Sequence, residues 1–187
     1  SSSGVALLYL ANNELNYVTL DTNLLSSQIQ ASVDNSILFS DTLNKQITRG
    51  AFAKGRNFWA RNIYRDRDIN SSASGVGFKD KSYGMAFGGE FDLDDSIKLG
   101  FAAANIDSNL NVADNQGGRD SNSFFAAAYA NYKTTNNLFA SLALTLGYHD
   151  NKNSRAVTNN GVQAFARSDS TDKEIGLNFQ VGKKFTV

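Results

Sequence analysis

The chain has 187 residues, of which 41% are hydrophobic, and its 18 basic and 18 acidic residues give a formal net charge of zero. Balanced charge gives no argument for a nucleic-acid partner, and the lack of cysteine excludes a disulfide framework and any cysteine-ligated metal site. Proline is also absent, which suits long strand ladders because proline cannot donate to a ladder.

The first twenty residues contain two short apolar runs, 5–10 and 15–20, with Asn12 and Asn13 between them. Asparagine favours turns because its side chain bonds to the nearby backbone. We therefore interpret residues 1–20 as a possible β-hairpin at the end of an upstream β structure.

Residues 21–50 have the apolar spacing of an α-helix, with Asp21 or Thr22 as a candidate N-cap and Gly50 as the candidate end. The periodic apolar positions are Leu25, Ile29, Val33 and Ile37, with Leu43 and Ile47 on a nearby face. Most of the other residues are neutral hydrogen-bonding types (Ser, Asn, Gln and Thr) instead of a Glu/Lys mixture. This helix either packs on a soluble sheet or lies in a wet but confined space.

From residue 58 onward the sequence predicts a meander of six strands, near 58–66, 82–93, 96–107, 122–133, 137–149 and 172–183. In the fifth strand Leu142, Leu144 and Leu146 share one face, whereas Ser141 and Thr145 share the other. The second, third and sixth strands alternate in the same way. The first strand and the alanine-rich fourth strand do not reveal which face is which.

The predicted connections alternate between long and short. Residues 66–81, 107–121 and 149–171 form long polar segments, and short turns lie around 94–95 and 134–137. Outer-membrane barrels have short periplasmic turns and long extracellular loops, and a tilted membrane strand needs about 9–11 residues. A soluble sandwich has no reason for this alternation.

The polar faces of the strands also favour the membrane. They carry Gly, Ala, Ser and Asn with scattered charge, whereas soluble outer faces carry many Lys and Glu residues. The predicted fold class is therefore an all-β membrane barrel, an antiparallel meander of about six strands, preceded by one α-helix. Trp59, Tyr83, Tyr129 and Tyr148 are among the aromatic residues expected near strand ends or on outer faces, as in interfacial aromatic girdles.

A polar helix is followed by Trp59, Tyr83-Gly84, Gly88-Gly89 with Asp92, a turn at Asp94-Asp95, and Leu99-Gly100. The order and spacing of these motifs resemble the C-terminal translocator domain of type Va autotransporters of Gram-negative bacteria. The resemblance runs from about Asn35 to the end of the chain.

The resemblance implies a barrel of twelve strands with the helix threaded through its pore. It also implies a secreted N-terminal passenger, an outer-membrane location with the N-terminal side exposed at the cell surface, and three partners: the passenger, outer-membrane lipid and the barrel-assembly machinery. Six strands cannot close around a helix, and the last residue, Val187, is not the terminal aromatic of the family. We therefore expect residues 51–187 to be the N-terminal half of the barrel, 21–50 the pore helix and 1–20 the passenger end or linker.

In such a barrel the small polar faces line the pore. The predicted pore-lining residues are Glu90, Asp92, Lys98, Ser141, Thr145, Glu174, Asn178 and Gln180. The expected function is secretion of the passenger through the pore, which the helix plugs afterwards. The alternatives are a small outer-membrane porin or adhesin barrel and a soluble secreted β domain.

The sequence predicts no enzyme, no cofactor and no metal site. His149, the one histidine, is expected in a loop or at the barrel rim. Some autotransporters cut their own passenger at an asparagine inside the pore, but Asn35 and Asn44 stand singly in the predicted helix. We predict no self-cleavage.

Overall fold

The computed structural model describes residues 7–11, 14–18, 27–51, 53–70, 77–112, 117–134, 138–159 and 162–183. They form one helix and eight strands: β1 (Leu7–Ala11), β2 (Glu14–Val18), α1 (Ser27–Gly50), β3 (Asn57–Ile69), β4 (Phe78–Asp92), β5 (Ile97–Val112), β6 (Gly117–Lys133), β7 (Leu138–Asn159) and β8 (Val162–Lys183). Within these ranges, no helix combines the length and apolar character needed to cross a membrane.

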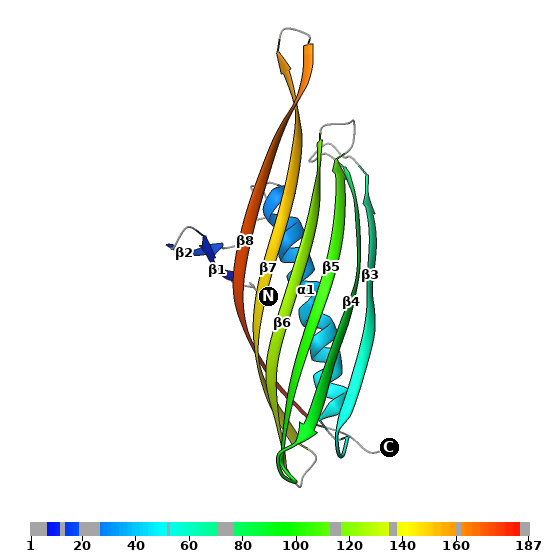
Figure 1. Cartoon of the computed structure of the whole chain (residues 1–187), viewed down its shortest axis with the longest axis vertical. Helices are drawn as coiled ribbons and strands as arrows, with labels where there is room; N and C mark the ends of the chain where they lie inside the picture. Colours follow the sequence, from blue (N-terminus) through cyan, green and yellow to red (C-terminus); the bar gives the residue numbers. More distant parts are fainter. Residues whose placement is uncertain are drawn as a thin grey trace.

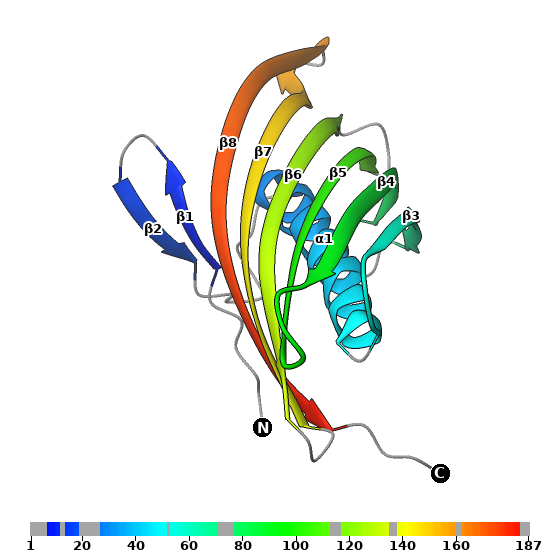
Figure 2. The same cartoon turned by 60° about the horizontal axis from the view of Figure 1, so that its bottom comes forward.

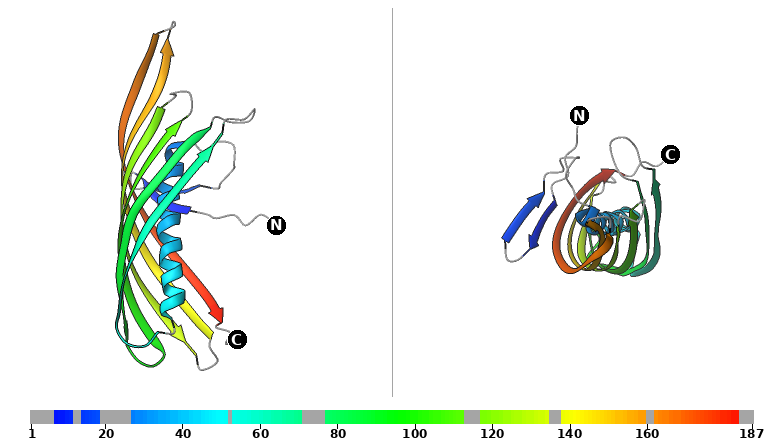
Figure 3. Two further views of the ribbon diagram at one scale, coloured as in Figure 1. Left: turned by 90° about the vertical axis from the view of Figure 1, so that its right-hand side faces the viewer. Right: turned by 90° about the horizontal axis from the view of Figure 1, so that it is seen from above.

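Strands β3 to β8 form an antiparallel meander in which each strand pairs with the next along the chain. The sheet curves around α1, which lies on its concave side (Figures 1 and 3). In the described residues the sheet stays open. One end is β3, and the other is extended by the β1–β2 hairpin, which pairs with β8 at Tyr9↔Glu174 and Leu10↔Lys173 (Figure 2).

The six predicted strands are confirmed as β3 to β8, but the prediction of long loops between them is wrong. Half of the first long polar segment and most of the other two belong to strands. The connections are therefore only the short stretches between Ile69 and Phe78, Val112 and Gly117, and Asn159 and Val162. The ladder continues because backbone pairing needs no apolar side chain. Serine and asparagine fill the inner positions there, as at Ser108 and Ser121, which are buried.

The short turn between β4 and β5 is confirmed, and Asp94 explains its shape. The Asp94 carboxylate Oδ1 accepts hydrogen bonds from the backbone N–H of Ser96 (2.6 Å) and Ile97 (2.8 Å). An aspartate that binds backbone groups two and three residues later holds the chain in a tight reversal. The turn therefore fixes the register in which β5 returns along β4.

Helix α1 begins at Ser27 in the described residues and ends at Gly50, as predicted. The candidate caps Asp21 and Thr22 lie outside the described residues. The predicted apolar stripe is only partly correct, because Ile37 is 47% exposed while Phe39 is fully buried together with the correctly predicted Leu43 and Ile47. Neutral polar residues occupy every side of the helix. The distribution of apolar residues alone therefore does not identify its buried face.

The outer, convex face of the sheet is apolar over a continuous band. Its large side chains are between 40% and 83% exposed, among them Phe58, Tyr83, Phe101, Phe124, Leu144 and Leu177. A soluble protein rarely leaves so large a contiguous apolar surface in water. Two aromatic positions were predicted wrongly: Tyr129 is 4% exposed on the inner face, and Trp59 packs against the buried cluster.

Candidate functional site: the inner face of the sheet

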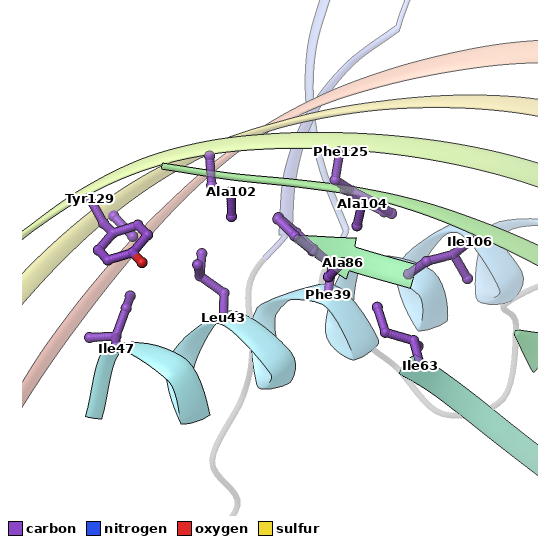
Figure 4. Close-up of a cluster of buried hydrophobic side chains, with 12 residues drawn as sticks. Phe39, Leu43, Ile47, Ile63, Ala86, Ala102, Ala104, Ile106, Phe125 and Tyr129 are labelled. Carbon is purple, nitrogen blue, oxygen red and sulfur yellow. The ribbon is translucent and has the colours of Figure 1, made fainter. Parts of the chain in front are cut away.

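An apolar seam joins the middle of α1 to the sheet. Phe39, Leu43 and Ile47, spaced by four residues, are each 1% exposed. They face small wall residues such as Ala86, Ala102 and Ala104 (Figure 4). Because alanine leaves little side-chain volume, the helix can approach the strands closely.

One aromatic pair belongs to this seam. The rings of Phe39 on α1 and Phe125 on β6 stack with centroids 4.9 Å apart and an interplanar angle of 16°. Both side chains are essentially inaccessible to solvent. The seam therefore fixes which side of α1 faces β5 and β6.

Towards the N-terminal end of α1 the interface becomes polar. Asn35, which is 0% exposed, donates to Ser123 Oγ on β6 (2.9 Å) and accepts from Ser108 Oγ on β5 (2.5 Å). Its side-chain amide is thus satisfied on both sides by the wall, as burial of an amide requires.

His149 continues this cluster, and its predicted place in a loop or at the rim is wrong. It lies within β7, is 1% exposed, and has Nδ1 2.9 Å from Ser123 Oγ. Its Nε2 lies 3.5 Å from Glu174 Oε2, and the same carboxylate oxygen accepts a hydrogen bond from Ser36 Oγ of α1 (2.6 Å). The wall therefore holds two successive helix residues, Asn35 and Ser36.

A network of four charges ties the helix to β3 and β4. Arg65 Nη2 lies 2.7 Å from Asp80 Oδ2, and Arg67 Nη2 lies 2.6 Å from Asp34 Oδ2. Cross contacts complete the network, at 3.5 Å between Arg65 and Asp34 and 3.2 Å between Arg67 and Asp80. Since Asp80 is 0% exposed, this carboxylate depends on its two arginine partners.

Near the C-terminal end of α1, Glu90 is buried at 3% exposure, and its Oε1 accepts a hydrogen bond from the Tyr129 hydroxyl (2.9 Å). The Tyr129 ring lies over Gly100 of β5, where any Cβ would overlap the ring. The glycine of the predicted Leu99-Gly100 motif is thus required for close packing inside the sheet.

Asp92 and Lys98 form an ion pair on the inner face, where β4 ends and β5 begins. Lys98 Nζ lies 2.7 Å from Asp92 Oδ1 and donates to the Gly55 carbonyl (3.1 Å). The Gly55 N–H donates to Asp92 Oδ2 (2.6 Å), and Gly55 has a φ of 81°, which glycine adopts readily. This arrangement holds the α1–β3 connection against the ends of β4 and β5.

The eight predicted pore-lining residues all lie on the strand face that bears the helix. Glu90, Lys98, Ser141 and Thr145 are buried, Glu174, Asn178 and Gln180 are half-buried, and Asp92 is exposed at the end of β4. Gln180 donates to Thr48 Oγ1 of α1 (3.0 Å). The role of these residues in a conducting pore stays a prediction.

The prediction missed residues that carry much of the helix contact: Asn35, Arg65, Arg67, Asp80, Ser108 and Ser123. Four of them lie in segments predicted as a long loop or at a predicted strand end, where the apolar alternation had stopped. Ser82 and Asp80 continue the inner face of β4 at a two-residue spacing. Extending the alternation into the polar segments would have found Asp80 and Ser108.

Beyond the apolar band, charges on the outer face pair across strands. Lys79 Nζ lies 3.0 Å from Asp68 Oδ2, and this hydrogen bond together with the charge of Asp68 raises the pKa of Lys79. Lys81 lies 3.5 Å from Asp66. On the inner face of β6, burial lowers the pKa of Arg119. The outer face of these strand ends is therefore solvated and charged, whereas Arg119 on the inner face is buried.

Together, an apolar outer band, a polar inner face and an axial helix define a membrane β-barrel protein with a filled interior. A family model, the autotransporter beta-domain, matches residues 58–187. The chain belongs to this family, which places it in the bacterial outer membrane. No curated protein sequence matches the chain significantly.

Proposed function

We propose that this chain is part of a pore that secretes an N-terminal passenger, and that α1 plugs the pore afterwards. The observation that carries the proposal is the close packing of α1 against the inner face of the sheet. This packing combines the buried Phe39–Leu43–Ile47 seam with polar contacts at Asn35 and Ser36. Polar walls with alanine and serine suit the passage of an unfolded chain because they offer hydrogen bonds without deep apolar pockets.

Further elements of the proposal concern orientation and assembly. The N-terminal side of α1 would face the cell exterior, with residues 1–20 leading from the passenger. The assembly partners would be outer-membrane lipid and the barrel-assembly machinery. The exposed band of large apolar side chains on β3 to β8 supports lipid contact, and it disfavours a soluble secreted β domain.

We also propose that the domain transports without catalysing a reaction. Ser123, His149 and Glu174 stand in the order of a hydrolytic triad, but Ser123 is 0% exposed and its Oγ already binds Asn35. The mass of the mature protein tests this point. An intact helix is expected, and a cut within α1 would overturn it.

A fusion experiment tests secretion. A folded reporter is joined ahead of Ser1 of the full-length protein, and intact cells are treated with a protease. We expect the reporter to be cleaved at the cell surface. Reporter that stays protected while the barrel migrates as a folded, heat-modifiable species would contradict secretion and would favour a plain porin or adhesin barrel.

A further inference from the structure

Two rows of polar side chains cross the outer face directly above the apolar band. Cross-strand pairing places Tyr83, Asp107, Asn122 and Asp150 of β4 to β7 in the first row. The second row, two residues further along each strand, holds Asn109, Asp120 and Lys152. Residues paired across strands or separated by two share a face of the sheet, so all seven side chains belong to one surface.

These seven residues, with Ser108 and Ser121, line a recess of about 420 Å³, which we call the outer recess. Since neighbouring strands lie about 4.8 Å apart, the row from Tyr83 to Asp150 spans roughly 14 Å. The outer recess is thus elongated across the strands and suits a short chain of rings better than a single small ion.

The lining selects the chemistry of the ligand. Among the described lining residues, three carboxylates against one ammonium group disfavour an anion, and apart from the Tyr83 ring there is no apolar side chain to bind a hydrophobic ligand. Within the described ranges, no three His, Cys, Asp or Glu side chains are placed to hold a metal ion. A neutral molecule with many hydroxyl groups remains the best match.

The polar groups are also oriented in advance. Asn109 Nδ2 donates to Asp120 Oδ1, and Asn122 Nδ2 donates to Asp107 Oδ1, both at 2.5 Å. Carboxylates accept hydrogen bonds from hydroxyl groups, while amides and ammonium groups can donate to them. Asp150 and Lys152 are exposed and form no side-chain hydrogen bond or ion pair with the described part of the chain. Both groups can therefore bind a ligand without breaking an internal contact.

The position of the outer recess indicates where such a ligand comes from. The next row towards the membrane contains Met85, Phe124 and Tyr148, which are 46–60% exposed and belong to the apolar band. Tyr83, 61% exposed, stands between the two zones and offers a ring face for stacking. We propose that the outer recess binds neutral hexose units in the sugar portion of an outer-leaflet glycolipid. This proposal rests on the outer-membrane location and does not depend on passenger secretion.

The test uses the full-length protein in detergent micelles and a neutral hexose oligosaccharide from the core of lipopolysaccharide, free of phosphate and of acidic sugars. Calorimetry compares wild type with the double variant Asp150→Ala/Lys152→Ala. The matched control is Asp68→Ala/Lys79→Ala, which removes one acid and one base from the outer face of β3 and β4, one row further from the recess. Both doubles leave the net charge unchanged.

We expect saturable binding by wild type and about tenfold weaker binding by Asp150→Ala/Lys152→Ala, the loss of roughly one charge-assisted hydrogen bond. The control should stay within about twofold of wild type, since its side chains lie outside the contact. No saturable binding by wild type, or equal losses in the two doubles, would overturn the proposal.

A second arm separates the membrane-bound sugar from the lipid. Phospholipid vesicles that contain either lipid A alone or lipopolysaccharide with its core sugars are offered to the same proteins. Stronger association with the core-containing vesicles, reduced by Asp150→Ala/Lys152→Ala, supports the proposal. Equal association with both vesicles that the double variant leaves unchanged contradicts it. Secretion of a fused reporter by the same variant should be normal, so the two proposals fail separately.

Discussion

At the scale of single residues, the inner face depends on buried polar groups that have one or two specific partners. Glu90 relies on the Tyr129 hydroxyl, and Asp80 relies on Arg65 and Arg67. A buried polar group that loses its partner still bears the full free-energy cost of its desolvation. Removing one partner therefore lowers the stability by more than the net free energy that the contact contributes when it forms.

Tyr129→Phe removes only the hydroxyl and leaves Glu90 buried without that donor. We expect it to lower the free energy of unfolding by about 1–3 kcal/mol, measured by denaturant titration of the refolded full-length protein. Tyr132→Phe on the same strand is the control, because Tyr132 is 52% exposed on the outer face. Equal effects of both substitutions would contradict the role of the Tyr129–Glu90 bond.

Asp80→Ala leaves Arg65 and Arg67 with Asp34 as their remaining carboxylate partner in the network. Breaking a buried ion-pair network in this way costs about 3–5 kcal/mol. Asp66→Ala, at an exposed position on β3, should cost less than about 1 kcal/mol. Unfolding midpoints of the two variants check the difference, and the four-charge network would lose its assigned role if Asp80→Ala were as mild as Asp66→Ala.

At the scale of elements, alternation along the strands predicted their positions and faces well, because one face carries large apolar side chains and the other small or polar ones. It failed where the outward residues become polar, as at Asn109 and Lys152, since both faces then look alike although the ladder continues. In β6 both alanine and aromatic residues occupy the two faces, with Phe125 inward and Phe124 outward, so the sequence does not distinguish the inner face. In α1 the buried position of Phe39 was missed because polar residues occupy every side of the helix.

The faces of β8 give a direct test with adjacent residues. Leu177 points outward and is 74% exposed, whereas Asn178 is half-buried on the inner face. Leu177→Arg should cost about 2–4 kcal/mol in a bilayer because the charge faces the acyl chains near the midplane. Asn178→Arg should cost clearly less. Folding titrations into lipid vesicles measure both, and the reverse order would invert the assignment of the faces.

The seam of α1 is testable at Phe39. Phe39→Ala removes most of the stacked ring and should cost about 3–5 kcal/mol, whereas Phe39→Leu keeps much of the apolar volume and should cost less than about 2 kcal/mol. Protease digestion of the folded protein should then release α1 faster in Phe39→Ala than in Phe39→Leu. Unchanged protection in both variants would show that the seam does not hold the helix.

At the scale of the whole molecule, the apolar outer band, the curved meander and the axial helix act together. In our proposal the band contacts lipid, the curvature creates an inner face, and the small residues on that face leave room for a chain. The same inner positions that now contact α1 are those that we propose a passenger would pass. A plugged pore and an open one would then differ only in what occupies this face.

The most direct test of that account follows a passenger during its passage. A photo-crosslinking residue is placed either at Ser141, buried on the inner face, or at the adjacent Leu142, 50% exposed on the outer face, in a full-length protein whose fused passenger is stalled part-way. We predict crosslinks to the passenger from position 141 and none from position 142. Crosslinks from neither position, or equal yields from both, would contradict passage along this face.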